Sequence, residues 1–178
     1  NLVKKVSNLK SMNFFKGLGN YFDKVQRMRK LGGMISDELL ISKEKVELSA
    51  SICKTDLTSE LVGEFPELQG LMGGYFSAYQ GFDKDISLAL SEQYLPVGLN
   101  SKVPKKPFSV ALSVTDKIDT IVGFFGINEK PTSSKDPLAL RRIALGIIRT
   151  LIENKKNLKF NDLLNYSRSL YEDQGFNL

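Results

Sequence analysis

The chain has 178 residues, with 25 basic and 20 acidic side chains and a formal charge of +5, so it fits one domain of ordinary size and carries only a modest basic excess. It contains no histidine, which removes the commonest zinc ligand and the commonest general base, and with them most hydrolytic and metal-dependent mechanisms. No apolar run approaches the roughly 18 residues of a membrane span, and the single Cys53 cannot form an internal disulfide, so we expect a cytoplasmic protein with no membrane contact.

Apolar residues recur at helical spacing from the N-terminal third onward. A first helical segment is expected over Tyr21 to Gly32. A stronger pattern predicts one continuous helix over Lys43 to Gly63, because its apolar residues lie three and four apart on one face: Val46, Ala50, Cys53, Leu57 and Leu61. Cys53 on that face is expected to pack in the core.

A glycine-rich segment follows this helix. Pro66 is suited to the first position of a new helix, where its missing N–H does no harm. Gly70 and Gly73 would permit another backbone to pack tightly against them. Helices are expected over Glu67 to Gln80 and Asp83 to Tyr94.

Three aromatic residues lie at helical spacing in the first of these helices: Tyr75, Phe76 and Tyr79. Such residues can stack on nucleic-acid bases, but the pattern is more typical of core packing. We therefore expect them to be buried.

The second half of the chain alternates loops and helices. The proline-containing segment Leu95 to Pro107 predicts a loop, and Phe108 to Phe125 has an apolar stripe wide enough for a central, deeply buried helix. After a loop over Gly126 to Lys135, a third strong helix is expected with Asp136 as N-cap and Pro137 at its first position.

A last helix is expected over Phe160 to Tyr171, and no segment shows the strict alternation of a half-buried strand. The prediction is an all-α fold, a bundle of roughly seven or eight helices.

Three sequence blocks carry a family resemblance. They are Gly63-Glu64-Phe65-Pro66-Glu67-Leu68-Gln69-Gly70, Thr115-Asp116-Lys117-Ile118-Asp119-Thr120 and Asp136-Pro137-Leu138-Ala139-Leu140-Arg141-Arg142. In this order they resemble the β subunit of bacterial glycyl-tRNA synthetase, over a region from about Gly17 through Glu153. Because the β subunit of that family is far longer, the resemblance implies that the chain is a fragment.

The resemblance also implies a fold, a complex and partners. The fold would be an HD-like helical domain over residues 1–155, with residues 156–178 starting a following helical region of the anticodon-binding type. The complex would be a glycine–tRNA ligase of two α and two β subunits, in which the α subunit binds ATP and Mg²⁺ and the β subunit binds tRNA(Gly). No cofactor is expected in the fragment itself, and the fragment alone is not expected to be catalytic.

The HD superfamily uses histidines and aspartates to hold a catalytic metal, and this site looks degenerate here. Aligned with that signature, Thr55 stands at a histidine position, Asp56 at the aspartate of the dyad and Asp116 at the distal aspartate. One alternative is a degenerate phosphohydrolase that uses Asp56 and Asp116 with a loosely held Mg²⁺. We favour a structural role, in which both aspartates pair with Lys54 and Lys117 or accept hydrogen bonds from buried backbone.

Asp116 and Asp119 lie three residues apart and therefore share a helix face. Paired carboxylates can act as acid and base, but no substrate-binding motif accompanies them. We expect at least one to pair with a basic residue of another helix, and Arg141 or Arg142 is one candidate.

A basic block provides the candidate tRNA-binding residues: Lys135, Arg141, Arg142, Arg149 and Lys156. If the helix continues, Arg142, Arg149 and Lys156 form a stripe at intervals of seven that would suit a phosphate backbone. The alternatives are a solvated face, and a purely structural spacer that contacts no RNA.

Overall fold

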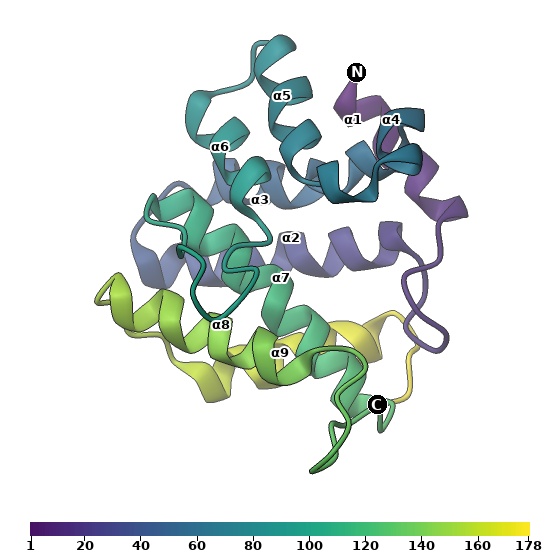
Figure 1. Ribbon diagram of the computed structural model, residues 1–178, viewed down its shortest axis with the longest axis vertical. Coiled ribbons are helices and arrows are strands. Elements are labelled where there is room, and N and C mark those ends of the chain that lie inside the picture. The colour runs from purple at the N-terminus through teal and green to yellow at the C-terminus, as the bar shows by residue number, and fades with distance from the viewer.

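The computed structural model describes residues 1–178 and is all-helical apart from one isolated β-bridge between Asn13 and Asn20, which confirms the predicted all-α class (Figure 1). Its nine α-helices and three 3₁₀ helices are α1 (Leu2–Lys5), η1 (Val6–Ser11), α2 (Tyr21–Leu39), α3 (Lys43–Ile52), η2 (Thr55–Thr58), α4 (Glu60–Glu64), η3 (Pro66–Leu68), α5 (Leu71–Tyr79), α6 (Lys84–Glu92), α7 (Pro107–Gly126), α8 (Leu140–Glu153) and α9 (Phe160–Asp173). No helix combines the length and apolar character that crossing a membrane requires.

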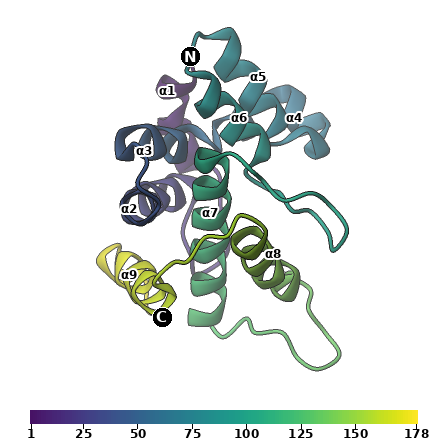
Figure 2. The same ribbon diagram turned by 90° about the vertical axis from the view of Figure 1, so that its left-hand side faces the viewer.

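Helix α7 is the centre of the structure. It contacts α2, α3, α6, α8 and α9, and every residue from Ser109 to Asp119 is buried. Figure 2 shows α8 and α9 on opposite sides of the lower half of α7, with α2 and α3 beside its upper half. A helix that is surrounded in this way is apolar nearly all round, so the polar residues that it does bury require partners.

The last helix packs on the same core as the earlier ones. Leu163 and Leu170 of α9 belong to one hydrophobic cluster with Leu31 of α2 and Ile118 of α7. The division near residue 155 stays a prediction.

The prediction of a single helix over Lys43 to Gly63 is wrong. The chain forms α3, then η2, then α4, because the break carries Asp56 into the interior. There the Asp56 Oδ2 accepts hydrogen bonds from the backbone N–H groups of Gly70 at 2.6 Å and Gly73 at 3.2 Å. A Cβ on Gly73 would lie 3.3 Å from this oxygen, so the Asp56 carboxylate makes the close approach there. At Gly70 the Tyr94 ring and the Leu90 backbone oxygen come close, at 2.9 Å and 3.3 Å from the position of a Cβ.

The helix expected from Pro137 begins three residues later. The N-cap residue is therefore Ala139 and not Asp136, although the Asp136 carboxylate still accepts from the first two helical N–H groups, Oδ1 from Leu140 at 2.8 Å and Oδ2 from Arg141 at 2.9 Å. Helix α8 then ends at Glu153, and Lys155 adopts a left-handed conformation with φ of 53°. Lys156 therefore lies beyond the helix.

The expectation that the aromatic residues of α5 are buried is wrong for two of them. Tyr75 is 63% exposed and Tyr79 is 93% exposed, whereas Phe76 packs against the core. The small residues Gly73, Gly74 and Ser77 form the buried face of α5 instead. Close packing against α6 is the reason, because a Cβ on Gly74 would lie 2.8 Å from the Ser87 backbone oxygen.

Candidate functional site

Two facing helices carry matched pairs of opposite charge. Lys24 and Arg27 lie three residues apart on α2, and Asp116 and Asp119 lie three residues apart on α7, so each pair shares a helix face. With Lys54, at the break after α3, they form what we call the buried charge cluster: Lys24, Arg27, Lys54, Asp116 and Asp119. All five residues are buried.

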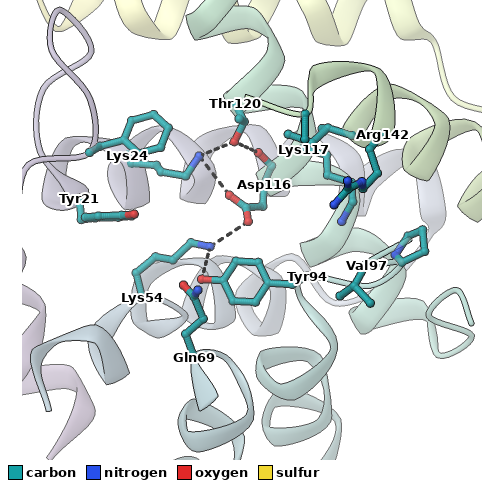
Figure 3. Close-up of a pocket in the computed structure, with 14 residues that line it drawn as sticks. Tyr21, Lys24, Lys54, Gln69, Tyr94, Val97, Asp116, Lys117, Thr120 and Arg142 are labelled. Atoms are coloured by element: carbon teal, nitrogen blue, oxygen red, sulfur yellow. Dashed lines mark hydrogen bonds and ion pairs between the residues drawn. The ribbon is translucent and has the colours of Figure 1, made fainter. Parts of the chain in front are cut away.

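Close ion pairs connect the members of this cluster. Lys24 Nζ lies 3.0 Å from Asp116 Oδ1 and 2.9 Å from Asp119 Oδ2, and so bridges the two carboxylates. On its other side Asp116 Oδ2 lies 2.8 Å from Lys54 Nζ, as Figure 3 shows. Arg27 Nε donates to Asp119 Oδ1 at 2.8 Å. The expectation that these aspartates pair with basic residues from elsewhere in the fold is confirmed.

Helix α9 completes the surroundings of Arg27. The guanidinium carbon lies 3.6 Å from the ring centroid of Tyr171, and Arg27 Nη1 donates to Gln174 Oε1 at 2.7 Å. The Tyr171 hydroxyl in turn donates to the backbone oxygen of Asp119 at 2.8 Å. The cluster thereby joins α2, α7 and α9.

Electrostatics keep the carboxylates of Asp116 and Asp119 and the ammonium group of Lys54 ionised. Burial alone would raise the pKa of Asp116, but the charges of Lys54 and Lys24 hold that pKa well below its usual range. Burial likewise acts to raise the pKa of Asp119, and Lys24 with Arg27 brings it below the usual value. For Lys54 burial acts to lower the pKa, and Asp116 raises it well above the ordinary lysine value.

The residues that the resemblance aligns with the HD positions have structural partners. The Thr55 hydroxyl donates to the Ile52 backbone oxygen at 2.6 Å, and Asp56 accepts the two glycine N–H groups described above. Asp116 is flanked by two lysine ammonium groups, in the space beside the carboxylate where a metal ion would have to bind. This arrangement does not fit a catalytic Mg²⁺ site, so the phosphohydrolase alternative is not favoured.

We expect Lys117 to pair with Asp56 or Asp116, and the structure shows that it pairs with neither. Its Nζ donates to the Leu95 backbone oxygen at 2.8 Å and to Ser113 Oγ at 2.8 Å. Nor do Arg141 and Arg142 pair with Asp116 or Asp119, because both arginines are exposed. Lys24 and Arg27 take that role.

The basic block is divided between structural and open positions. Arg149 donates to the backbone oxygens of Leu99 at 2.8 Å and Ser101 at 3.0 Å, so it holds the loop before α7. Because Lys156 lies beyond the end of α8, the proposed continuous helical stripe does not form.

The other three members lie at the opposite end of α8. Lys135 and Arg141 both donate to Thr132. The Lys135 backbone N–H donates to the Thr132 hydroxyl oxygen, and the Arg141 guanidinium donates to the Thr132 backbone oxygen. Arg142 is exposed. The structure thus brings Lys135, Arg141 and Arg142 together around the start of α8.

A cavity of about 390 Å³ lies between the buried charge cluster and the start of α8 (Figure 3). Its lining includes Lys24, Lys54, Asp116, Lys117 and Arg142 together with the rings of Tyr21 and Tyr94. The sequence reasoning missed Lys24, Arg27, Tyr21 and Tyr94. A usable signal existed for the first two, since a basic pair at a spacing of three matches the acidic pair on the central helix.

Comparisons with known proteins agree with one another. Residues 1–177 match the sequence model of a family described as "Glycyl-tRNA synthetase beta subunit". The chain is 43% identical over 172 residues to the glycine–tRNA ligase beta subunit of Rickettsia canadensis, covering 97% of this chain and 25% of that protein. It is 43% identical over 159 residues to the glycine–tRNA ligase beta subunit of Stutzerimonas stutzeri, and the match covers 89% of this chain and 23% of that protein. It is 42% identical over 172 residues to the glycine–tRNA ligase beta subunit of Acinetobacter baumannii, and the match covers 97% of this chain and 25% of that protein.

Proposed function

This chain belongs to the glycyl-tRNA synthetase beta subunit family, and from that membership we propose that it forms part of a glycine–tRNA ligase, to which it supplies scaffold and a tRNA contact. The chain spans about a quarter of the length of the curated relatives it matches. In the proposed enzyme, ATP and Mg²⁺ act through the α subunit, in a cytoplasmic complex of two α and two β subunits, and this chain contributes no catalytic group.

The scaffold role is supported by the buried charge cluster. Ionisable residues in an interior can mark catalytic sites, but here each carboxylate is held by ammonium or guanidinium groups at 2.8 to 3.0 Å. Hydrogen bonds between buried charged groups are directional and join specific helices. The cluster therefore fixes α7 against α2 and α9, which gives a rigid platform.

The tRNA contact is proposed for the exposed start of α8. Lys135, Arg141 and Arg142 are all exposed there, and Arg142 takes part in none of the ion pairs of the structure. An exposed arginine with no carboxylate partner keeps its guanidinium available for bidentate contact with phosphate. The exposed, unpaired guanidinium of Arg142 is the observation that carries this proposal. Lys156 stays a candidate, outside the helix. Arg149 also stays a candidate, although its guanidinium already binds a loop.

Salt-dependent tRNA binding tests the contact. Arg142→Ala should weaken tRNA binding and lower the magnitude of the log–log salt slope by about one, because one fewer phosphate is neutralised. Arg29→Ala is the matched control, since Arg29 is also exposed but lies on α2. Equal slopes for the parent and Arg142→Ala, with both proteins folded, would show that this arginine does not contact tRNA.

The assembled ligase provides the functional counterpart. In a complex reconstituted with the α subunit, Arg142→Ala should raise the KM for tRNA and leave glycine activation without tRNA unchanged. A loss of glycine activation would instead indicate a disturbed assembly. The structural-spacer alternative predicts that neither quantity changes.

A further inference from the structure

The cavity beside the buried charge cluster has walls from distant parts of the chain. Lys24 comes from α2, Lys54 from the break after α3, Lys117 from α7 and Arg142 from α8. Figure 3 shows Lys117 and Arg142 on one side and Lys24 and Lys54 on the other, with Asp116 between them. The volume of about 390 Å³ falls within the roughly 300–1,000 Å³ of small-molecule sites.

Positive charge exceeds negative charge around this cavity. Three buried cations, Lys24, Lys54 and Lys117, line it, against one buried carboxylate, that of Asp116. Arg142 adds one more positive charge at the rim. Asp116 is the one carboxylate that lines the cavity, and its charge is already shared by Lys24 and Lys54.

Lys117 is the cation without a counter-ion. Its side chain is buried, with 7% exposure, and its Nζ contacts only neutral oxygens, of Leu95 and Ser113. A buried ammonium group that no carboxylate neutralises destabilises the protein unless another anion binds near it. Arg142, which lines the same cavity, also lacks a carboxylate partner.

We propose that this cavity binds a small phosphate monoester, with the phosphate between Arg142 and Lys117. The guanidinium fork matches two phosphate oxygens, and the ammonium group supplies a third charged donor. The rings of Tyr21, Tyr94 and Phe14 also line the cavity and offer contacts to an apolar or aromatic body of the ester. Arg142 is shared with the tRNA contact proposed above, whereas Lys117 is buried, cannot reach a surface-bound RNA backbone and belongs to the cavity alone.

Thermal unfolding with and without phosphate tests the site. Inorganic phosphate should raise the melting temperature above that in sodium chloride of equal ionic strength, because a ligand that binds only the folded protein stabilises it. Arg142→Gln and Lys117→Met should each weaken phosphate binding by about tenfold or more, as expected for loss of a charged donor. Arg141→Gln is the matched control, since Arg141 neighbours Arg142 but does not line the cavity, and it should bind phosphate like the parent.

A second ligand identifies the source of the phosphate. AMP should bind more tightly than inorganic phosphate if the tyrosine rings receive an organic body; equal affinities would support the anion site with free phosphate as its ligand. The proposal is overturned if phosphate gives no shift beyond chloride, or if Arg142→Gln binds phosphate as the parent does. Unchanged phosphate binding in Arg142→Gln overturns the proposal even if Lys117→Met fails to fold.

A tRNA measurement separates this site from the proposed tRNA contact. Lys117→Met should lose phosphate binding and keep the parental salt slope for tRNA. If tRNA binding fails in the parent while phosphate still binds, the tRNA contact is wrong and the cavity proposal stands.

Discussion

The buried charge cluster and the basic block of α8 use the same kinds of charged residue in opposite ways. In the cluster, Asp116 and Asp119 lie next to the fully buried Ile118 on α7. Because the apolar residues of α7 pack in the core, the two carboxylates are buried with them. On α8 the buried residues are Leu140, Gly146, Ile147, Thr150 and Leu151, whereas Arg142 is exposed in the first turn. The neighbouring apolar residues, and not the charges, decide which group must find a partner inside the protein.

The difference in burial sets the energy of each charge. A buried ion pair that loses one partner leaves an uncompensated charge in the interior, at about 3 to 5 kcal/mol, whereas exposed pairs contribute about 0 to 1 kcal/mol. We therefore expect substitutions in the cluster to change stability, and substitutions at the exposed start of α8 to change binding.

Asp119→Asn should give the largest loss of stability. It removes the charge shared by Lys24 and Arg27 and should lower the free energy of unfolding by about 3 to 5 kcal/mol, measured by urea denaturation. Asp173→Asn is the matched control, because Asp173 is exposed at the end of α9 and its change should stay within about 0.5 kcal/mol. An Asp119→Asn variant as stable as the parent would mean that the cluster does not hold α2 and α7 together.

Much of this contrast could be predicted from sequence. The apolar period around Ile118 predicted the central helix, and the spacing of Asp116 and Asp119 predicted a shared face with basic partners elsewhere. The identity of those partners could not be read, because Lys24 lies 95 residues from Asp119 in the chain and local patterns carry no information on such pairings.

The errors also have physical causes. The break after α3 was missed because Asp56 leaves the helix to accept hydrogen bonds from Gly70 and Gly73, which is a tertiary effect. Ser59, whose hydroxyl accepts from the Val62 N–H, was the available local signal for a new helix start. The basic residues of α8 looked like one stripe because the end of the helix at Glu153 has no proline or glycine to mark it.

Lys117 sharpens the comparison, because it is buried like the cluster but has no carboxylate partner. Burial lowers its pKa to about 8 from an ordinary value of 10.5. Between pH 8 and pH 10.5, Lys117 is protonated in the unfolded chain but has released its proton in the folded protein. The contribution of Lys117 to the free energy of unfolding therefore becomes more favourable as pH rises from about 8. Without phosphate, Lys117→Met should therefore gain about 1 to 3 kcal/mol relative to the parent at pH 7, and this difference should shrink by pH 9.5.

The difference between the two proteins is the quantity to measure, by urea denaturation across this pH range. Burial also raises the pKa of the Cys53 thiol to about 12, which favours unfolding above pH 9, but Cys53 is present in both proteins and cancels. The lost hydrogen bonds to Leu95 and Ser113 lower the stability of the variant at every pH, so they shift the difference without changing its slope. A difference that does not change with pH would mean that Lys117 is neutralised by a group within the protein.

The smallest effects are expected on α8, where two arginines of one helix should differ. Arg149→Ala removes hydrogen bonds to the backbone oxygens of Leu99 and Ser101 and should lower the free energy of unfolding by about 1 kcal/mol. Arg142→Ala removes no internal partner and should change it by less than about 0.5 kcal/mol in phosphate-free buffer. Urea denaturation of both variants, side by side, measures the contrast. Equal losses would place Arg142 among the structural residues and leave Lys135 and Arg141 as the exposed cations for tRNA at this end of the helix.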